Sequence, residues 1–146
     1  MYLLSGKNIT CGYSSVDILS NCTIGVKRGQ IASIVGPNGA GKSTAMKAIF
    51  GLLDIRKGQI FLDGEDITNL RPQERVLKGM GFVPQTNNIF PSLSVQENLE
   101  MGAFIQAKNC EDMLNYIYEL FPILKDKRYQ QAGELSGGQR QQVAVG

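Results

Sequence analysis

The sequence predicts an α/β fold, and three observations support this prediction. Residues 31–35, IASIV, form a continuous apolar run rich in β-branched side chains, which is typical of a strand buried on both faces of a parallel sheet. A glycine-rich stretch and then a segment with helical spacing, from about Lys42 to Leu53, follow this run. Residues 80–84, MGFVP, have the character of a second buried strand. Since helical patterns replace strand patterns from Gln85 onward, we expect one composite domain.

Further β structure is expected on both sides of the first buried strand. In residues 1–30, the strand-like segments YLLSGKNIT and CTIGV flank the turn-prone sequence GYSS. The segment GQIFLDGEDI predicts a strand that enters a turn at Asp63 and Gly64, because an Asp-Gly pair favours the positive φ angles of a tight hairpin. These segments alternate with turn residues, as short antiparallel strands do.

Three helix signals can be placed from the sequence. Pro72 suits the first turn of a short helix. Ser94 and Glu97 form a capping box, which predicts a helix beginning at Val95. A later helix is expected to end at Pro122, and one face of it carries an apolar stripe that we expect to pack into the core. The stripe consists of Met113, Leu114, Ile117, Leu120 and Phe121.

Composition excludes several classes of function. The 146 residues, 42% of them hydrophobic, suffice for a packed core. The 15 basic and 13 acidic residues give a net charge of +2 without a basic block, so we expect no nucleic-acid partner. Three cysteines without paired spacing, in a chain without histidine, predict free thiols in a reducing compartment and no ordinary zinc site. No apolar run approaches a membrane span, so we expect a cytoplasmic chain.

The glycine-rich stretch matches the motif G-x-x-x-x-G-K-[ST] and stands between a strand and a helix, as the motif requires. Its glycines let successive backbone N–H groups point at phosphate oxygens, and the helix N-terminus adds partial positive charge. Lys42 is expected to reach the β and γ phosphates of a nucleotide, and the Ser43 hydroxyl to ligate Mg²⁺. The predicted phosphate site comprises Gly36, Pro37, Asn38, Gly39, Ala40, Gly41, Lys42, Ser43 and Thr44.

A second glycine-containing motif, LSGGQ, lies almost a hundred residues further along the chain. Ser136 is a good N-cap and Gln139 completes a capping box, so a helix should begin at Gly137 with its positive end exposed. Read alone, this segment could be only a glycine-rich helix start. Together with the phosphate loop, it indicates a second anion site formed by Leu135, Ser136, Gly137, Gly138 and Gln139.

With this pair of motifs, the sequence resembles the nucleotide-binding subunits of ABC transporters over its whole length. The resemblance implies a P-loop NTPase fold, the ABC nucleotide-binding domain, with an antiparallel β subdomain at residues 1–30 and 55–65. A P-loop core at 31–54 and 66–86, a helical subdomain at 87–135 and a signature helix at 136–146 would complete this partial domain. It also implies that Tyr13 stacks on adenine, although a turn tyrosine is the alternative. Gln85 would be the glutamine that touches Mg²⁺ or the attacking water.

The resemblance further implies ATP and Mg²⁺ as ligands and a head-to-tail partner, a second ATP-binding subunit. Membrane permease subunits would dock through the Gln85 loop and the helical subdomain, which would hold the protein at the inner face of the cell membrane. The segments FLDGEDITNLRPQERVLKGMGFVPQTNNIFPSLSVQENLEMGAF and YELFPILKDKRYQQAGELSGGQ are most similar to subunits that serve branched-chain amino acid importers. The ATP-binding subunits of urea importers and the ATPase of lipopolysaccharide export resemble these segments as well, so the substrate class stays open.

The family's metal-binding aspartate, catalytic glutamate and switch histidine follow the signature helix, and the 146 residues contain no counterparts. The nearest substitute, Asp63 after an apolar run, is better explained as the Asp-Gly turn. We therefore expect a truncated chain that lacks the C-terminal part of the core sheet and binds nucleotide without hydrolysing it at a useful rate. The alternatives are a nucleotide-binding module that never hydrolyses, an inactive fragment, and an ABC ATPase that acts on DNA or the ribosome.

Overall fold

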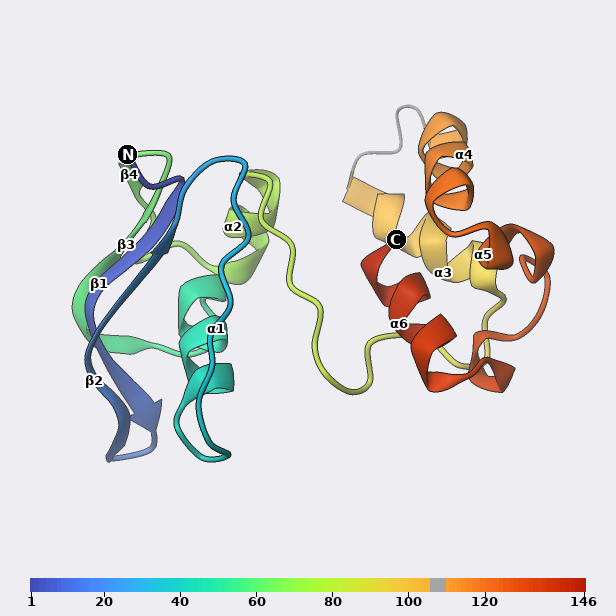
Figure 1. The fold of residues 1–146 in the computed structure, drawn as a ribbon. Helices are drawn as coiled ribbons and strands as arrows, with labels where there is room; N and C mark the ends of the chain where they lie inside the picture. The colour runs from blue at the N-terminus through green and yellow to red at the C-terminus, as the bar shows by residue number, and fades with distance from the viewer. Residues whose placement is uncertain (106–109) are drawn as a thin grey trace. The chain divides into compact units, whose positions relative to one another are not determined.

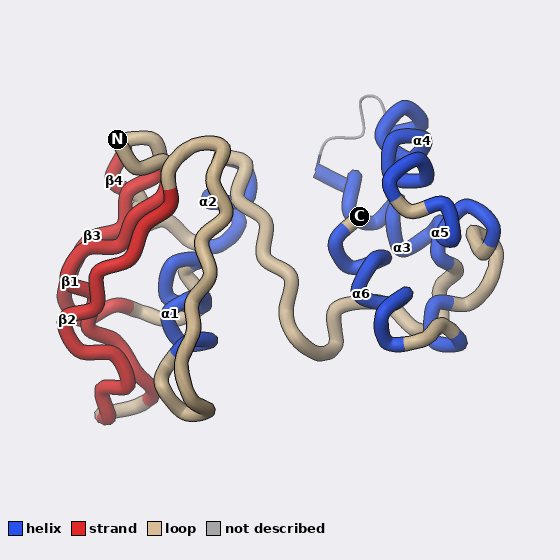
Figure 2. Tube along the Cα trace, in the orientation of Figure 1, coloured by secondary structure: helices blue, strands red, loops and turns tan. Residues whose placement is uncertain are grey.

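A computed structural model describes residues 1–105 and 110–146, and this part of the chain divides into two compact units (Figure 1). The first unit is Met1–Gly81 and the second is Phe82–Gly146. The first combines a sheet with helices, and the second is helical (Figure 2). The prediction of an α/β fold is confirmed, and each unit has a hydrophobic core of its own.

The sheet of the first unit is antiparallel and has the strand order β2-β1-β3-β4. Residues 1–30 form the expected hairpin, in which Leu4 pairs with Val26 at one end and Tyr13 with Val16 at the other. The turn at Asp63 and Gly64 is also confirmed, since both residues have positive φ angles, 50° and 86°. The strands are β1 (Leu4–Tyr13), β2 (Val16–Val26), β3 (Ile55–Leu62) and β4 (Glu65–Asp66).

Helix α1 (Lys42–Phe50) covers one face of this sheet (Figure 1). It ends three residues before the predicted Leu53, because Gly51 adopts a left-handed conformation with φ 84°. The Gly51 N–H then bonds Ala48 O at 3.0 Å and the Leu52 N–H bonds Lys47 O at 2.9 Å, which terminates the helix. The core between helix and sheet consists of Ile9, Cys11, Leu19, Ala45, Ala48, Ile49, Ile60 and Ile67.

The two buried parallel strands predicted at 31–35 and 80–84 are not present. Neither segment belongs to a sheet in the described residues, where the antiparallel sheet holds every named strand. Ile31 and Val35 are almost fully exposed, at 101% and 86%. The physical reason is that an apolar run becomes a strand only beside a hydrogen-bonding neighbour, and no described segment pairs with either run.

The second unit is built from helices that meet in one core. Its helices are α3 (Val95–Gly102), α4 (Cys110–Leu120), α5 (Pro122–Asp126) and α6 (Gly137–Val145), with 3₁₀ turns η1 (Ala103–Ile105) and η2 (Ala132–Glu134); the short α2 (Pro72–Leu77) belongs to the first unit. The core comprises Val95, Leu99, Tyr118, Leu124, Ala132, Leu135 and Val143.

The helix signals read from the sequence are confirmed at their start positions. Pro72 occupies the first turn of α2. The Ser94 hydroxyl accepts from Glu97 N at 3.2 Å, and Glu97 Oε2 accepts from Ser94 N at 2.7 Å, so α3 begins at Val95 as predicted. Pro122 separates α4 from α5.

The apolar stripe of α4 is only partly a core face. Leu114, Ile117 and Phe121 pack against the core, whereas Met113 and Leu120 are 60% and 52% exposed. Tyr118 is buried in the core instead. The predicted stripe was wider than the face that is buried, because a short helix on the outside of a small unit buries a narrower face than its apolar pattern spans.

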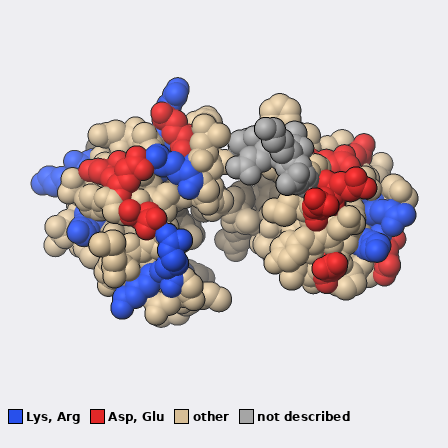
Figure 3. All heavy atoms as spheres, turned by 90° about the horizontal axis from the view of Figure 1, so that it is seen from above, with Lys and Arg blue, Asp and Glu red and all other residues tan. Residues whose placement is uncertain are grey.

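The distribution of surface charge and the lengths of the helices are relevant to the partners that the chain could bind. Lysine, arginine and acidic side chains are interspersed on the face shown in Figure 3, without a continuous basic surface outside the grey atoms. No helix among the described residues is long and apolar enough to cross a membrane.

Candidate functional site

The loop at residues 36–41 turns sharply into α1, and two glycines permit the turn. Gly39 has φ 86° and Gly41 has φ 85°, which side chains with a Cβ rarely adopt. A Cβ on Gly39 would meet no atom within 4 Å, so the loop is uncrowded at this position. A Cβ on Gly41 would lie 2.8 Å from Leu19 Cδ2, so Gly41 also lets the loop touch the β1–β2 hairpin.

The start of α1 offers unpaired donors and a cation. Its first N–H groups, from Lys42 to Thr44, have no acceptor within the helix. The Lys42 ammonium donates to Gly36 O and to Pro37 O, each at 2.7 Å, which places its charge over the loop. Ser43 is exposed beside it. Donors, helix dipole and ammonium thus converge at one place, and this arrangement attracts phosphate.

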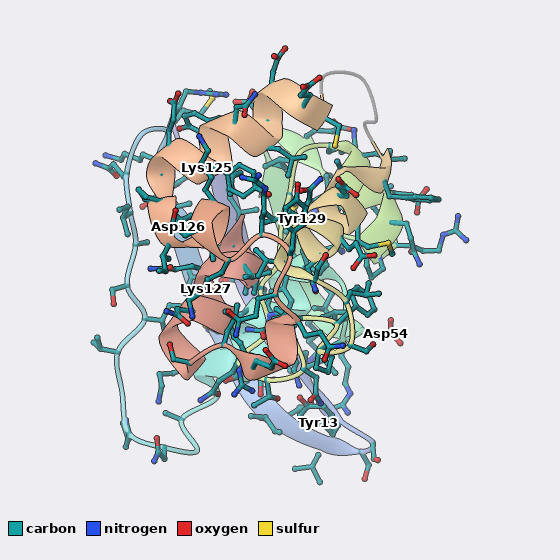
Figure 4. All side chains as sticks on the ribbon, turned by 90° about the vertical axis from the view of Figure 1, so that its right-hand side faces the viewer. Tyr13, Asp54, Lys125, Asp126, Lys127 and Tyr129 are labelled. Atoms are coloured by element: carbon teal, nitrogen blue, oxygen red, sulfur yellow. The ribbon has the colours of Figure 1, made fainter. Side chains whose placement is uncertain are left out.

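Tyr13 ends β1 at the tip of the hairpin, and Figure 4 labels it there. The ring is 45% exposed. Lys47, five residues after Lys42 on α1, places its Nζ 3.4 Å from the Tyr13 hydroxyl oxygen and 5.8 Å from the ring centroid. The ammonium therefore lies over the ring near its hydroxyl, and the 45% exposure leaves part of the side chain accessible to a stacking partner.

A buried arginine supports α1 from its other end. Arg75, on α2, is only 2% exposed, and burial lowers the pKa of its guanidinium. The guanidinium donates to Ile49 O at 2.5 Å, Thr68 O at 2.8 Å and Leu70 O at 2.9 Å. It thereby satisfies a carbonyl at the C-terminal end of α1, where the negative end of the helix dipole favours a cation. This role could not be predicted from the sequence, because an arginine on a short helix usually faces solvent.

The LSGGQ segment adopts the predicted helix start. The Ser136 hydroxyl accepts from Gln139 N at 3.3 Å, and Gln139 Oε1 accepts from Ser136 N at 3.2 Å. Leu135 is buried in the core of the second unit, while Ser136, Gly137 and Gly138 are exposed. A Cβ on either glycine would meet nothing within 4 Å, so no neighbour among the described residues requires these glycines for space.

Gln85 lies in an exposed segment of the second unit that two asparagines organise. Asn88 Nδ2 donates to Pro84 O at 3.2 Å and to Gln141 Oε1, on α6, at 2.9 Å. Asn98, on α3, accepts from Phe90 N at 2.7 Å and donates to Phe90 O at 3.0 Å. The segment after Gln85 is therefore fixed to both α3 and α6, and neither asparagine was identified from the sequence.

The predicted site residues thus fall into two groups. Tyr13 and the loop with Lys42 and Ser43 lie in the first unit, while Gln85 and residues 135–139 lie in the second. Each group lies within a single unit. No group of three or more acidic, histidine or cysteine side chains that could hold a metal exists in the part of the chain that the structure describes. A metal at Ser43 would therefore depend on oxygens of a bound nucleotide.

The open loop, the helix N-terminus and the lysine define a P-loop protein, the class that binds phosphate through backbone N–H groups. The ABC transporter family matches residues 19–146. The chain belongs to this family.

Three curated relatives span almost the whole chain. A probable branched-chain amino acid transport ATP-binding protein LivF of Archaeoglobus fulgidus is 39% identical, over 98% of this chain and 61% of its own length. The high-affinity branched-chain amino acid transport ATP-binding protein BraG of Pseudomonas aeruginosa is 34% identical, over 99% and 62%. The lipopolysaccharide export system ATP-binding protein LptB of Escherichia coli is 34% identical, over 99% and 61%. The chain spans about three fifths of the length of these relatives.

Solved structures agree with the fold. A nucleotide-free ATP-binding cassette of an ABC transporter superposes with a TM-score of 0.82 at 31% identity, over 99% of this chain and 63% of its own. A dimeric ATP-binding cassette in a post-hydrolysis state, bound to ADP and phosphate, gives a TM-score of 0.82 at 26% identity, over 97% and 67%.

Proposed function

We propose that this protein is the ATP-binding subunit that powers an ABC importer for branched-chain amino acids. The observation that carries the proposal is the convergence of the Lys42 ammonium, the glycine loop and the first N–H groups of α1 at one place. Family membership makes ATP the natural ligand of that place.

The residues of the first unit fit ATP and Mg²⁺. The backbone of residues 36–41 and Lys42 would hold the phosphates, and the exposed Ser43 hydroxyl would contribute one oxygen to Mg²⁺. The accessible ring of Tyr13 would stack on adenine. Mg²⁺ supplies charge neutralisation on the phosphates when bound, and we keep for Gln85 the proposed role of touching the metal or the attacking water.

We further propose that two such subunits close head to tail, so that Ser136, Gly137 and Gly138 of one face the nucleotide of the other. The exposed start of α6, with its glycines uncrowded, supports this role. A dimeric relative bound to ADP and phosphate is consistent with it. In a full-length subunit, ATP binding would close the pair and hydrolysis would reopen it.

The organisation predicted from the sequence is kept as part of this proposal: a β subdomain, a P-loop core, a helical subdomain at 87–135 and a signature helix. Permease subunits would dock on the Gln85 segment and the helical subdomain, which would place the protein at the cytoplasmic face of the membrane. The exposed Phe90, in the segment that Asn98 fixes, supports a docking role there.

The substrate class is proposed from LivF and BraG, whose names both specify branched-chain amino acids. LptB, whose name specifies lipopolysaccharide export, is the rival at a similar identity to BraG. Deleting the gene in its host and measuring uptake of labelled leucine, isoleucine and valine separates the two. Unchanged uptake together with a defect in lipopolysaccharide export would favour the rival.

Nucleotide binding is tested directly by titrating the chain with Mg-ATP in a calorimeter. The Lys42→Ala variant should bind at least about tenfold more weakly, because it loses a charge-assisted contact to phosphate of about 1.5–3 kcal/mol. Lys57→Ala, at an exposed position on β3, is the matched control and should bind like the unmodified chain. Equal affinities for Lys42→Ala and the unmodified chain would contradict the proposal. Phosphate release, compared between the same variants, tells a hydrolysing subunit from a module that only binds.

A further inference from the structure

Arg56 lies on β3 but holds the turn that joins β1 to β2. One nitrogen of its guanidinium, Nη1, pairs with Asp17 Oδ1, and another, Nη2, donates to Ser14 O. Ser14 follows Tyr13 directly and has a positive φ of 51°, a conformation that a non-glycine residue rarely adopts without support. The arginine therefore fixes a turn whose backbone does not favour its own geometry.

The turn is also close to the phosphate loop. On β1, Cys11 pairs with Leu19 of β2. Leu19 in turn lies beside Gly41, because a Cβ on Gly41 would lie 2.8 Å from Leu19 Cδ2. Tyr13 lies two residues beyond Cys11, about 7 Å along the strand at the usual rise per residue. Tyr13 thus lies on the hairpin end that Arg56 anchors, and the same hairpin approaches the phosphate loop at Leu19 and Gly41.

We propose that Arg56 is a positioning residue of the nucleotide site, which holds the β1–β2 turn so that Tyr13 presents its ring to the base. This inference rests on the proposed function, since it assumes that ATP binds at the loop and that Tyr13 stacks on adenine. Lys47 assists from α1 through its contact with the Tyr13 hydroxyl. Lys47 of α1 therefore holds the hydroxyl of Tyr13, and Arg56 of β3 holds the backbone that follows Tyr13.

Removal of Arg56 should weaken the binding of the base and leave the binding of phosphates unchanged. Base stacking on an aromatic ring contributes to nucleotide affinity, and a mobile turn would lose part of this contribution, so ATP affinity should fall about fivefold. Inorganic tripolyphosphate, which has no base, should bind the loop with unchanged affinity. A merely structural role of Arg56 would instead weaken both ligands together.

The experiment titrates the chain with Mg-ATP and, separately, with magnesium tripolyphosphate. The variants are Arg56→Met, Arg56→Lys and Asp17→Asn. Arg56→Met should show the selective loss, and Arg56→Lys should recover part of the ATP affinity, because a lysine can make one of the two contacts but not both. Asp17→Asn should show a smaller selective loss, because the bond to Ser14 O remains. The matched control is Arg28→Met, which removes an exposed ion pair with Asp63 in the same unit and should change neither affinity.

Each outcome has a separate meaning. A selective loss for Arg56→Met with partial recovery for Arg56→Lys supports the inference. Unchanged ATP affinity, or an equal loss for both ligands, overturns it while the proposed function stands. If the unmodified chain binds neither ligand, the proposed function itself fails, and the inference fails with it.

Discussion

The side chain of Asn88 joins the segment that contains Gln85 to helix α6, because its Nδ2 donates both to Pro84 O and to Gln141 Oε1. We expect Asn88→Ala and Gln141→Ala to show a coupling of about 0.5 kcal/mol in the free energy of unfolding, as for a partly exposed hydrogen bond. A double-mutant cycle in urea measures it. Strict additivity of the two substitutions would show that the bond contributes nothing.

Arg75 should be among the costliest positions to change in the first unit. Arg75→Met would leave the carbonyls of Ile49, Thr68 and Leu70 without their donor, at a cost of about 3 kcal/mol in unfolding free energy. Arg75→Lys should cost less but remain destabilising, because an ammonium cannot reach carbonyls on three sides as the planar guanidinium does.

The control for this prediction is Arg71→Met, whose side chain is 79% exposed and pairs with Glu74 of α2. We expect a change within about 0.5 kcal/mol there. Chemical denaturation followed by circular dichroism gives all three values. A loss of unfolding free energy at Arg75 no larger than that at Arg71 would contradict a stabilising role for the hydrogen bonds of Arg75 to the three carbonyls.

Acid should destabilise the chain partly through Glu97. The backbone N–H of Ser94, and then its hydroxyl, lower the pKa of Glu97 below the usual value of 4.5. Because the folded pKa is lower than the unfolded one, the contribution to stability is present above the unfolded pKa and is lost as pH falls through the folded pKa. Glu97→Gln, which keeps an acceptor oxygen but no charge, should therefore flatten the stability profile below about pH 5.

Urea midpoints measured from pH 3 to pH 7 check this prediction, in the range where carboxylates of pKa about 4 titrate. Glu111→Gln, at an exposed acid on α4, provides the control. Parallel profiles for Glu97→Gln and the unmodified chain would show that this carboxylate does not contribute to the acid dependence.

Local signals in the sequence were sufficient for the helix starts and the hairpins. Ser94 and Ser136 each cap a helix with a partner three residues away, and Asp63 and Gly64 form their turn within four residues. Such features depend on short-range geometry, which a sequence states directly. The phosphate loop was predictable for the same reason.

Features that depend on distant partners were not predictable. Arg56 and Asp17 lie 39 residues apart, and Asn88 and Gln141 lie 53 apart. Nothing in the residue types says that these side chains meet. The strand predicted at 31–35 was wrong for a related reason, because an apolar run indicates burial but does not supply the neighbour that a strand needs.

The exposure of that apolar run can be tested by paired truncations. Ile60→Ala, at a fully buried position of β3, should cost about 3 kcal/mol in unfolding free energy, whereas Ile31→Ala should stay within about 0.5 kcal/mol. Both substitutions remove the same atoms, so the difference measures burial alone. A cost above about 2 kcal/mol at Ile31 would support a buried strand there after all.

Gly138 separates a structural role for the LSGGQ segment from a functional one. It lies in the first turn of α6, and a Cβ would meet no atom within 4 Å. Gly138→Ala should therefore raise unfolding free energy by about 0.5–1 kcal/mol, since alanine loses less backbone entropy than glycine in a helix. Under the proposed function the same methyl group would stand in front of an N–H that faces the partner's nucleotide. ATP-dependent association should then be weakened although the fold is stronger.

Analytical ultracentrifugation with and without Mg-ATP measures the association, and urea denaturation measures the stability. Gly102→Ala, at the end of α3 and equally uncrowded, is the control that should leave association unchanged. If Gly138 served only to form the helix, its replacement by alanine would improve both the association and the stability. Opposite signs in the two measurements for Gly138→Ala, and not for Gly102→Ala, therefore indicate that this glycine serves the approach of a ligand, because its own helix is more stable without it.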